Sequence, residues 1–324
     1  MSFAKALASI VSQMAQGTPI WKISAPASIH TDKSGLDITI QAVFSNHATL
    51  EMLNAVDSTD DPIERLALIL SALMNPHHIW SPDKPYNPIL GEFISGTTLI
   101  GTDLYSIDLE QINHHPPVVN FKVQGPTFSY SPVDGIDSTG GFKIGVNHVN
   151  ISFPDSFIRM VTKTKGHFEW NYCGIKLDPI FLGGKRTAGY HGDIWIKDPS
   201  GISFVGKVTK PLCIKGSLLG ADGSLLELVE GQMMDGGIMS KKSGKVWATP
   251  AAAKLFTMDI SEAVSIHPKY SRNVWKKVFE AMRQNTPDFN TADAEKMIIE
   301  NAQRRLTGVD FKSQFGFTCK YHAK

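Results

Sequence analysis

The chain of 324 residues lacks the marks of several common protein classes. It has three cysteines, Cys173, Cys213 and Cys319, and no CxxC pair, so neither a disulfide framework nor a zinc knuckle is indicated. The net charge of +1 argues against nucleic-acid binding, because that function needs a broad basic surface. The longest strongly apolar run, residues 66–74, is far shorter than a membrane span.

Signatures of catalysis and of targeting are also missing. The sequence has no HExxH, no GxSxG and no Walker loop. We therefore expect no catalytic residue, no metal ion and no cofactor, and an enzyme is the weaker alternative. The N-terminus has neither a basic segment followed by an apolar core nor an arginine-rich presequence. Together with the few cysteines, this predicts a cytoplasmic protein.

The middle of the chain is rich in short, strand-like runs. From Glu92 to about Trp247, alternating or β-branched runs are separated by Gly, Pro, Asn and Asp. Many short strands without intervening helices predict an antiparallel sheet that curls into a barrel or sandwich, with room for an internal ligand cavity. The runs cover residues 97–100, 118–123, 142–149, 157–164, 191–196, 202–208 and 225–229.

Helices are predicted on both sides of this region. Asp61-Pro62 is a good helix start, with proline at the first position, and the helix should continue to about Leu73. Residues 271–283 and 291–306 predict two helices near the C-terminus. Residues 36–44 alternate between apolar and polar side chains, which predicts a strand. No internal repeat or linker is present, so we expect one domain.

The first residues form an amphipathic pattern. Residues 2–15 predict a helix, and Gly17 and Pro19 follow it. Two interpretations stay open: an ordinary docked terminal helix, or a mobile flap whose apolar face covers a cavity. The residues on that face are Phe3, Leu7, Ile10, Val11 and Met14.

Residues 110–117, Glu-Gln-Ile-Asn-His-His-Pro-Pro, form an unusual local motif. Each proline fixes its own backbone and disfavours helical geometry in the residue before it, so His115 should be extended. His114 and His115 are thus presented by stiff backbone at the end of a predicted strand. The simpler alternative is a strand–turn–strand corner with two exposed histidines.

Two other elements supply positive charge. Lys84 precedes a proline-stiffened loop that contains Asn87. Lys296, Glu300 and Arg304 are spaced to share one stripe of a helix. The ordinary alternatives are a solvated lysine and a surface ladder of ion pairs. A set of lysines, arginine and histidines would suit phosphate recognition if the three elements met.

These residues carry a resemblance to a known family. Residues 110–117 resemble the signature octapeptide of the oxysterol-binding protein-related family, and residues 84–92 resemble its KPxNPxLGE loop. The N-terminal helix, the Ser24-Ala-Pro26 segment, the SRxxW helix at 271–275 and the late Lys/Glu/Arg stripe are also similar, in the family's order.

The resemblance implies a mixed α+β fold that is mainly β. It implies an incomplete antiparallel β-barrel around a hydrophobic tunnel, with an N-terminal helical lid and C-terminal helices. In this single lipid-transfer domain the expected parts are a lid at 1–24, a helix-and-strand segment at 25–83, the barrel at 84–248 and a helical part at 249–324.

The resemblance also implies a function and a set of binding residues. The implied ligand is phosphatidylinositol 4-phosphate, exchanged for a second lipid, a sterol or phospholipid, and moved between membranes. A lipid sensor or scaffold without net transfer is the alternative. The implied headgroup contacts, at the rim of the tunnel, are Lys84, His114, His115, Lys296 and Arg304. Glu300 would support them, and Asn87 and Leu90 would shape the same rim.

The expected protein is a monomer that meets membrane surfaces transiently, at the periphery of membranes in the cytoplasm, and binds no nucleic acid. Residues that meet the sterol hydroxyl in sterol-binding members cannot be matched here, so the second lipid stays open.

Overall fold

The structure, a computed structural model, leaves part of the chain undescribed. Of the predicted N-terminal helix, residues 2–15, the structure describes only residues 12 and 13, which are helical. Phe3, Leu7, Ile10, Val11 and Met14 lie outside the described residues, as does His115. The described residues are 12–13, 16, 25–44, 46–75, 83–114, 116–137, 141–144, 148–178, 187–210, 213–232, 237–242, 244, 246–248, 257–306 and 311–319.

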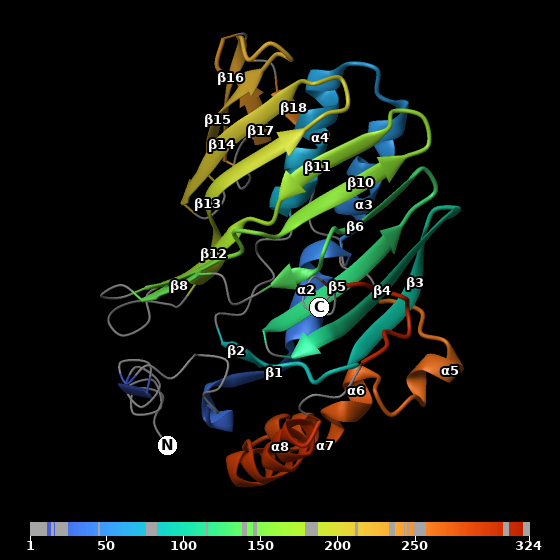
Figure 1. Cartoon of the computed structure of the whole chain (residues 1–324), viewed down its shortest axis with the longest axis vertical. Helices are drawn as coiled ribbons and strands as arrows, with labels where there is room; N and C mark the ends of the chain where they lie inside the picture. The colour runs from blue at the N-terminus through green and yellow to red at the C-terminus, as the bar shows by residue number, and fades with distance from the viewer. Residues whose placement is uncertain are drawn as a thin grey trace.

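The largest unit of the described chain is one curved antiparallel sheet (Figure 1). The main path of hydrogen-bonded neighbours runs β18-β17-β16-β15-β14-β13-β11-β10-β6-β5-β4-β3, and β7, β8, β9 and β12 pair beside it. Because this path has two ends, the barrel is not closed. The predicted incomplete antiparallel barrel is therefore confirmed.

Each of the seven predicted runs overlaps strands of the sheet, but seven strands of the described chain correspond to no predicted run: β6, β7, β11, β12, β15, β17 and β18. The strand predicted over 142–149 is two strands, β8 and β9. The bounds are β3 Phe93–Ile100, β4 Asp103–His114, β5 Pro117–Gln124, β6 Phe128–Pro132, β7 Ile136–Asp137, β8 Gly141–Ile144, β9 Val149–Ser152, β10 Phe157–Thr162, β11 His167–Asn171, β12 Gly174–Asp178, β13 Thr187–Lys197, β14 Ser203–Lys210, β15 Cys213–Leu219, β16 Leu225–Gln232, β17 Gly237–Ser240 and β18 Val246–Ala248.

Helices and two short strands complete the described fold. Helices α2 to α4 pack against the sheet, whereas α6 to α8 lie below it beside the parallel pair β1 and β2 (Figure 1). The bounds are η2 Ala27–Ile29, β1 His30–Ser34, α2 Gly35–Val43, α3 His47–Ala55, η3 Val56–Ser58, α4 Pro62–Met74, β2 Lys84–Tyr86, α5 Glu262–Ser265, α6 Ser271–Val274, α7 Lys276–Met282 and α8 Phe289–Arg304.

The strand predicted for residues 36–44 is wrong, because this segment is helix α2. The Ser34 hydroxyl accepts from the Leu36 amide, and the Asp37 carboxylate accepts from the Ser34 amide at 2.9 Å. This capping box starts a helix. Leu36 and Ile40, four residues apart, are both buried in the main core. The same apolar residues fit a period of two, so the pattern alone misled the prediction.

A buried ion pair fixes α4 to the sheet. The Arg65 guanidinium donates two hydrogen bonds to the Asp198 carboxylate, at 2.8 and 3.0 Å. Both side chains are nearly inaccessible to water. Removing either partner would leave an uncompensated buried charge, so this contact fixes the orientation of α4 against the β13–β14 hairpin.

Glu92 joins the sheet to the helices below it. Its carboxylate is fully buried and accepts four hydrogen bonds, two at each oxygen. The donors are the hydroxyls of Ser34 and Ser271 at 2.6 and 2.7 Å, the Trp275 indole at 2.9 Å and the Ile89 amide at 3.0 Å. One side chain thus ties the N-cap of α2, the 87–92 loop and α6 together. The similarity at 271–275 now has a structural reason, since Ser271 and Trp275 are two of these donors.

Replacing Glu92 should separate its role as acceptor from its charge. Glu92→Leu removes the acceptor of all four donors, and we expect a loss of about 3 kcal/mol or more in the free energy of unfolding. Glu92→Gln keeps a carbonyl oxygen for Trp275 and Ile89, and the two serine hydroxyls can rotate to accept from its amide, so its loss should be about 1 kcal/mol or less near pH 6. Urea denaturation measures both. Equal losses would contradict this account.

The pH dependence of stability gives a second test at Glu92. Burial raises the pKa of this carboxyl from 4.5 to about 7. Between these pH values the folded state therefore holds more protons than the unfolded state. The contribution to stability is complete below about pH 4.5 and is lost as pH rises through about 7. We expect the free energy of unfolding of the wild type, relative to Glu92→Gln, to fall across this range in urea titrations, and a rise would contradict the assignment.

Candidate functional site

Lys84 lies on the short strand β2, where β1 brings His30 opposite it. The Lys84 ammonium donates to the Asn87 side-chain oxygen at 2.9 Å and to the Pro85 carbonyl at 3.2 Å. Pro85 and Pro88 limit the backbone on both sides of Asn87. The predicted pair Lys84 and Asn87 is therefore one preorganised unit.

The predicted stripe on α8 is formed, and its N-terminal end is buried. The Glu300 carboxylate lies 3.2 Å from the Lys296 ammonium and 3.3 Å from the Arg304 guanidinium. Lys296 is only 4% exposed and donates to the Ala25 carbonyl. Arg304 is exposed and also donates to the Asn301 side-chain oxygen at 2.7 Å. Lys296 is therefore not part of an ordinary ladder of ion pairs on the protein surface.

Lys84 and the α8 stripe affect each other electrostatically. Burial and, next, the positive charge of Lys296 lower the pKa of Lys84 to about 8, while Glu300 opposes the shift. Two ammonium groups are thus held near each other in a poorly hydrated place. An anion bound between them would be stabilised by both charges and would relieve their repulsion.

His30 is a member of this group that sequence reasoning missed. Its ring stacks on Tyr86 at 4.3 Å, and its Nδ1 lies 2.9 Å from the Pro26 carbonyl. Because a carbonyl only accepts, Nδ1 carries the proton. Burial, then Lys84 and Lys296, lower the pKa of His30 to about 2, so the ring is neutral. No motif surrounds His30 in the sequence, and only the β1–β2 register places it here.

The loop at 89–92 connects α8 with the end of β4. The Leu90 amide donates to the buried Gln303 side chain of α8 at 2.9 Å, and the Gly91 amide donates to the Gln111 carbonyl at 2.9 Å. Gly91 has a φ of 76°, and a Cβ there would lie 2.9 Å from Phe311. Leu90 thus contributes backbone to the rim, and Gln303 is a second residue that sequence reasoning missed.

His114 is the last residue of β4, and its register partner is Pro117 at the start of β5. The corner is braced by its neighbours, because the Asn113 side chain donates to the Pro116 carbonyl at 2.9 Å. Glu110 is buried and accepts from the Ser313 hydroxyl and from the Gln314 amide at 3.3 Å. Much of the octapeptide is therefore structural and positions the corner that carries His114.

The structure brings most of the predicted headgroup residues to one end of the sheet. Direct contacts or electrostatic coupling join Lys84, Asn87, Lys296, Glu300 and Arg304. Leu90 joins them through Gln303, and Gly91 and Gln111 link this loop to the strand of His114.

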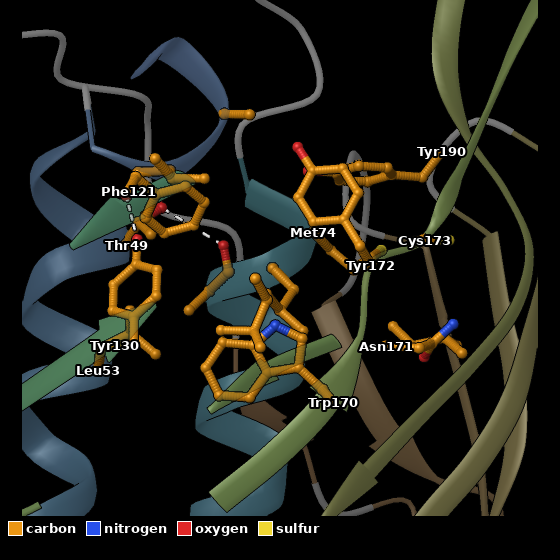
Figure 2. Close-up of a pocket in the computed structure, with 16 residues that line it drawn as sticks. Thr49, Leu53, Met74, Phe121, Tyr130, Trp170, Asn171, Tyr172, Cys173 and Tyr190 are labelled. Atoms are coloured by element: carbon orange, nitrogen blue, oxygen red, sulfur yellow. Dashed lines mark hydrogen bonds between the residues drawn. The ribbon is translucent and has the colours of Figure 1, made fainter. Parts of the chain in front are cut away.

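An apolar cavity lies between the helices and the sheet (Figure 2). Tyr130, Trp170, Tyr172 and Tyr190 supply most of its aromatic surface, and Thr49 supplies a hydroxyl. Its volume of about 40 Å³ holds a few water molecules, far less than a lipid chain needs. The side chains around it would have to separate to admit one. They are Ala42, Val43, Thr49, Leu53, Ala72, Leu73, Met74, Phe121, Tyr130, Ile158, Trp170, Asn171, Tyr172, Cys173, Tyr190 and Ile194.

Two findings bear on the expected absences. No group of three or more His, Cys, Asp or Glu suited to a metal ion occurs within the described part of the chain. Over the same residues, no helix has the length and apolar character needed to cross a bilayer.

Comparison with known protein sequences gives consistent results. The family profile described as oxysterol-binding protein matches residues 7–286. Protein KES1 of Mycosarcoma maydis is 28% identical over 285 residues, which cover 77% of this chain and 70% of that protein. Human oxysterol-binding protein-related protein 6 is 23% identical over 197 residues, 60% of this chain. The aligned part is about a fifth of that human relative, 20% of its length.

Solved structures show the same fold. The Osh3 ORD in complex with PI(4)P from Saccharomyces cerevisiae has a TM-score of 0.71 at 18% identity, covering 94% of this chain and 86% of that one. The Osh1 ORD domain in complex with cholesterol has a TM-score of 0.68 at 16% identity, covering 90% and 78%. Members of this family are lipid-binding domains, not enzymes. Because the profile extends over most of the sequence, from residue 7 to residue 286, the chain belongs to the oxysterol-binding protein family.

Proposed function

We propose that this chain binds phosphatidylinositol 4-phosphate and moves it between membranes. The observation that carries the proposal is the pair of neighbouring cations, half-buried Lys84 and buried Lys296, with Glu300 extending the group to Arg304. The headgroup phosphates would bind there and at the corner of His114 and His115. The Osh3 domain with a similar fold was solved with PI(4)P, which supports this ligand class.

The chemistry of the rim favours a phosphorylated headgroup over a neutral one. Arginine offers a planar fork of donors, and each lysine offers a compact charge. Charge-assisted hydrogen bonds contribute roughly 1.5–3 kcal/mol each. Glu300 would hold Lys296 and Arg304 in place without cancelling both charges, because it lies between them on the helix.

The acyl chains would occupy the aromatic cavity between helices α2 to α4 and the sheet. Moving a lipid through water exposes its chains at about 0.8 kcal/mol for each CH₂, so a carrier must enclose them. The predicted lid at residues 1–24 would complete the enclosure. A second lipid, a sterol or a phospholipid, would use the same space, so the two would exchange rather than bind together. The Osh1 domain solved with cholesterol supports the sterol as a candidate.

Removing both histidines tests the headgroup site. We expect His114→Ala with His115→Ala to reduce extraction of labelled phosphatidylinositol 4-phosphate from liposomes to background, with an unchanged circular dichroism spectrum. His167→Ala is a matched control, because this exposed histidine lies on β11, far from the rim (Figure 1). Extraction by the double variant at the wild-type level would disprove the assignment.

The charge of Lys84 should make binding depend on pH. With a pKa of about 8, this lysine loses its charge between pH 7 and 9, whereas an ordinary lysine keeps it. We expect the affinity for a soluble short-chain phosphatidylinositol 4-phosphate, measured by calorimetry, to fall about tenfold over this range. Lys84→Arg retains its charge and should give a flatter profile. A wild-type profile as flat as that of the arginine variant would contradict the prediction.

Deleting residues 1–17 tests the lid. We expect lower transfer between donor and acceptor liposomes and more leakage of bound lipid, with the stability of the barrel preserved. Unchanged transfer would refute the lid. Binding of the phosphoinositide without any net transfer by the intact chain would favour the sensor or scaffold alternative.

A further inference from the structure

The outward side of α8 carries two large apolar side chains that are mostly exposed. Met297 is 57% exposed and Ile298 is 63% exposed. At 3.6 residues per turn, Met297, Asn301 and Arg305 form a stripe displaced by one residue from Lys296, Glu300 and Arg304. The helix therefore has two parallel stripes, one turned to the headgroup rim and one turned to solvent.

The outward stripe has no acidic residue, although the helix and its N-cap have four. Each of the four is engaged elsewhere. Asp288 accepts from the Thr291 amide at 3.1 Å, Asp293 from the Ala27 amide at 2.7 Å, Glu295 lies 3.5 Å from Lys277, and Glu300 lies 3.2 and 3.3 Å from Lys296 and Arg304. Only Glu295 and Glu300 lie beside cations, and Asp288 and Asp293 keep their charge near the start of the helix. The solvent side is thus apolar and basic only from Met297 to Arg305.

We propose that the surface formed by Met297, Ile298, Asn301 and Arg305, continued by Arg304, docks on an anionic lipid bilayer. Met297 and Ile298 would enter the boundary between headgroups and acyl chains, and the two arginines would meet lipid phosphates. The inference rests on the proposed function, because docking here would bring the rim of Lys84 and Lys296 to the bilayer that supplies its ligand.

A second exposed apolar pair lies beside acidic side chains instead of basic ones. Leu99 and Leu104, 59% and 57% exposed, are cross-strand neighbours at the tip of the β3–β4 hairpin. The hollow at this tip includes Glu51, Asp57 and Asp103, which would repel an anionic surface. The hairpin tip and α8 lie at different ends of the sheet (Figure 1).

The two pairs provide a matched experiment. Met297→Asp with Ile298→Asp and Leu99→Asp with Leu104→Asp add the same charge at equally exposed sites. Membrane binding is measured by sedimentation with vesicles of phosphatidylcholine and phosphatidylserine that contain no phosphoinositide. Headgroup binding is measured by calorimetry with soluble short-chain phosphatidylinositol 4-phosphate. We expect the α8 variant to lose vesicle binding by about tenfold or more, the hairpin variant to bind as the wild type does, and both to keep their affinity for the soluble ligand.

Other outcomes would overturn the proposal. The first is vesicle binding by the α8 variant at the wild-type level, and the second is an equal loss in both variants. The third is a wild-type dimer, seen by light scattering, that the α8 substitutions dissociate, because this would identify a second copy of the chain as the occupant. Failure of the wild type to bind the soluble phosphoinositide would instead refute the proposed function, while the vesicle measurements would still decide whether α8 docks.

Discussion

The arrangement of the site depends on one buried carboxylate. Glu92 has no exposed surface, and its two oxygens satisfy four donors from three separate segments of the chain. A buried carboxylate is costly unless it is fully hydrogen-bonded, so each donor is needed. The loop that it holds carries Leu90 and Gly91, whose amides reach α8 and β4. The distance between the helix cations and the histidine corner is thus set by a residue that would touch no ligand.

The cation group is kept at a cost to the empty protein. Lys84 and Lys296 repel each other, and both are poorly hydrated. His30 stacks on Tyr86, and Tyr86 stacks on Trp275 of a buried apolar cluster. This packing leaves the cations little room to move apart. An anion bound as proposed would add to the negative charge of Glu300 without rearrangement, so this preorganisation would favour the bound state. The neutral His30 adds no further positive charge.

Much of the fold followed from the sequence. Period-two runs and turn residues predicted the antiparallel sheet, because one face of each strand is buried and the other is not. The motifs supplied Lys84, Asn87, Lys296, Glu300 and Arg304, which the structure joins. Residues 36–44 show the limit of this reasoning, since their apolar spacing fits both a strand and a helix. The capping box at Ser34 and packing against the core decided for the helix.

The sequence by itself determined the chemical groups, their local stiffness and the helix spacing that places Glu300 between two cations. Only the tertiary structure decided that Lys296 is buried, that His30 lies opposite Lys84 and that Gln303 holds Leu90. These are contacts between residues more than fifty positions apart in the chain. Local periodicity contains no information about such pairs, because they arise when separate elements compete to bury the same surface.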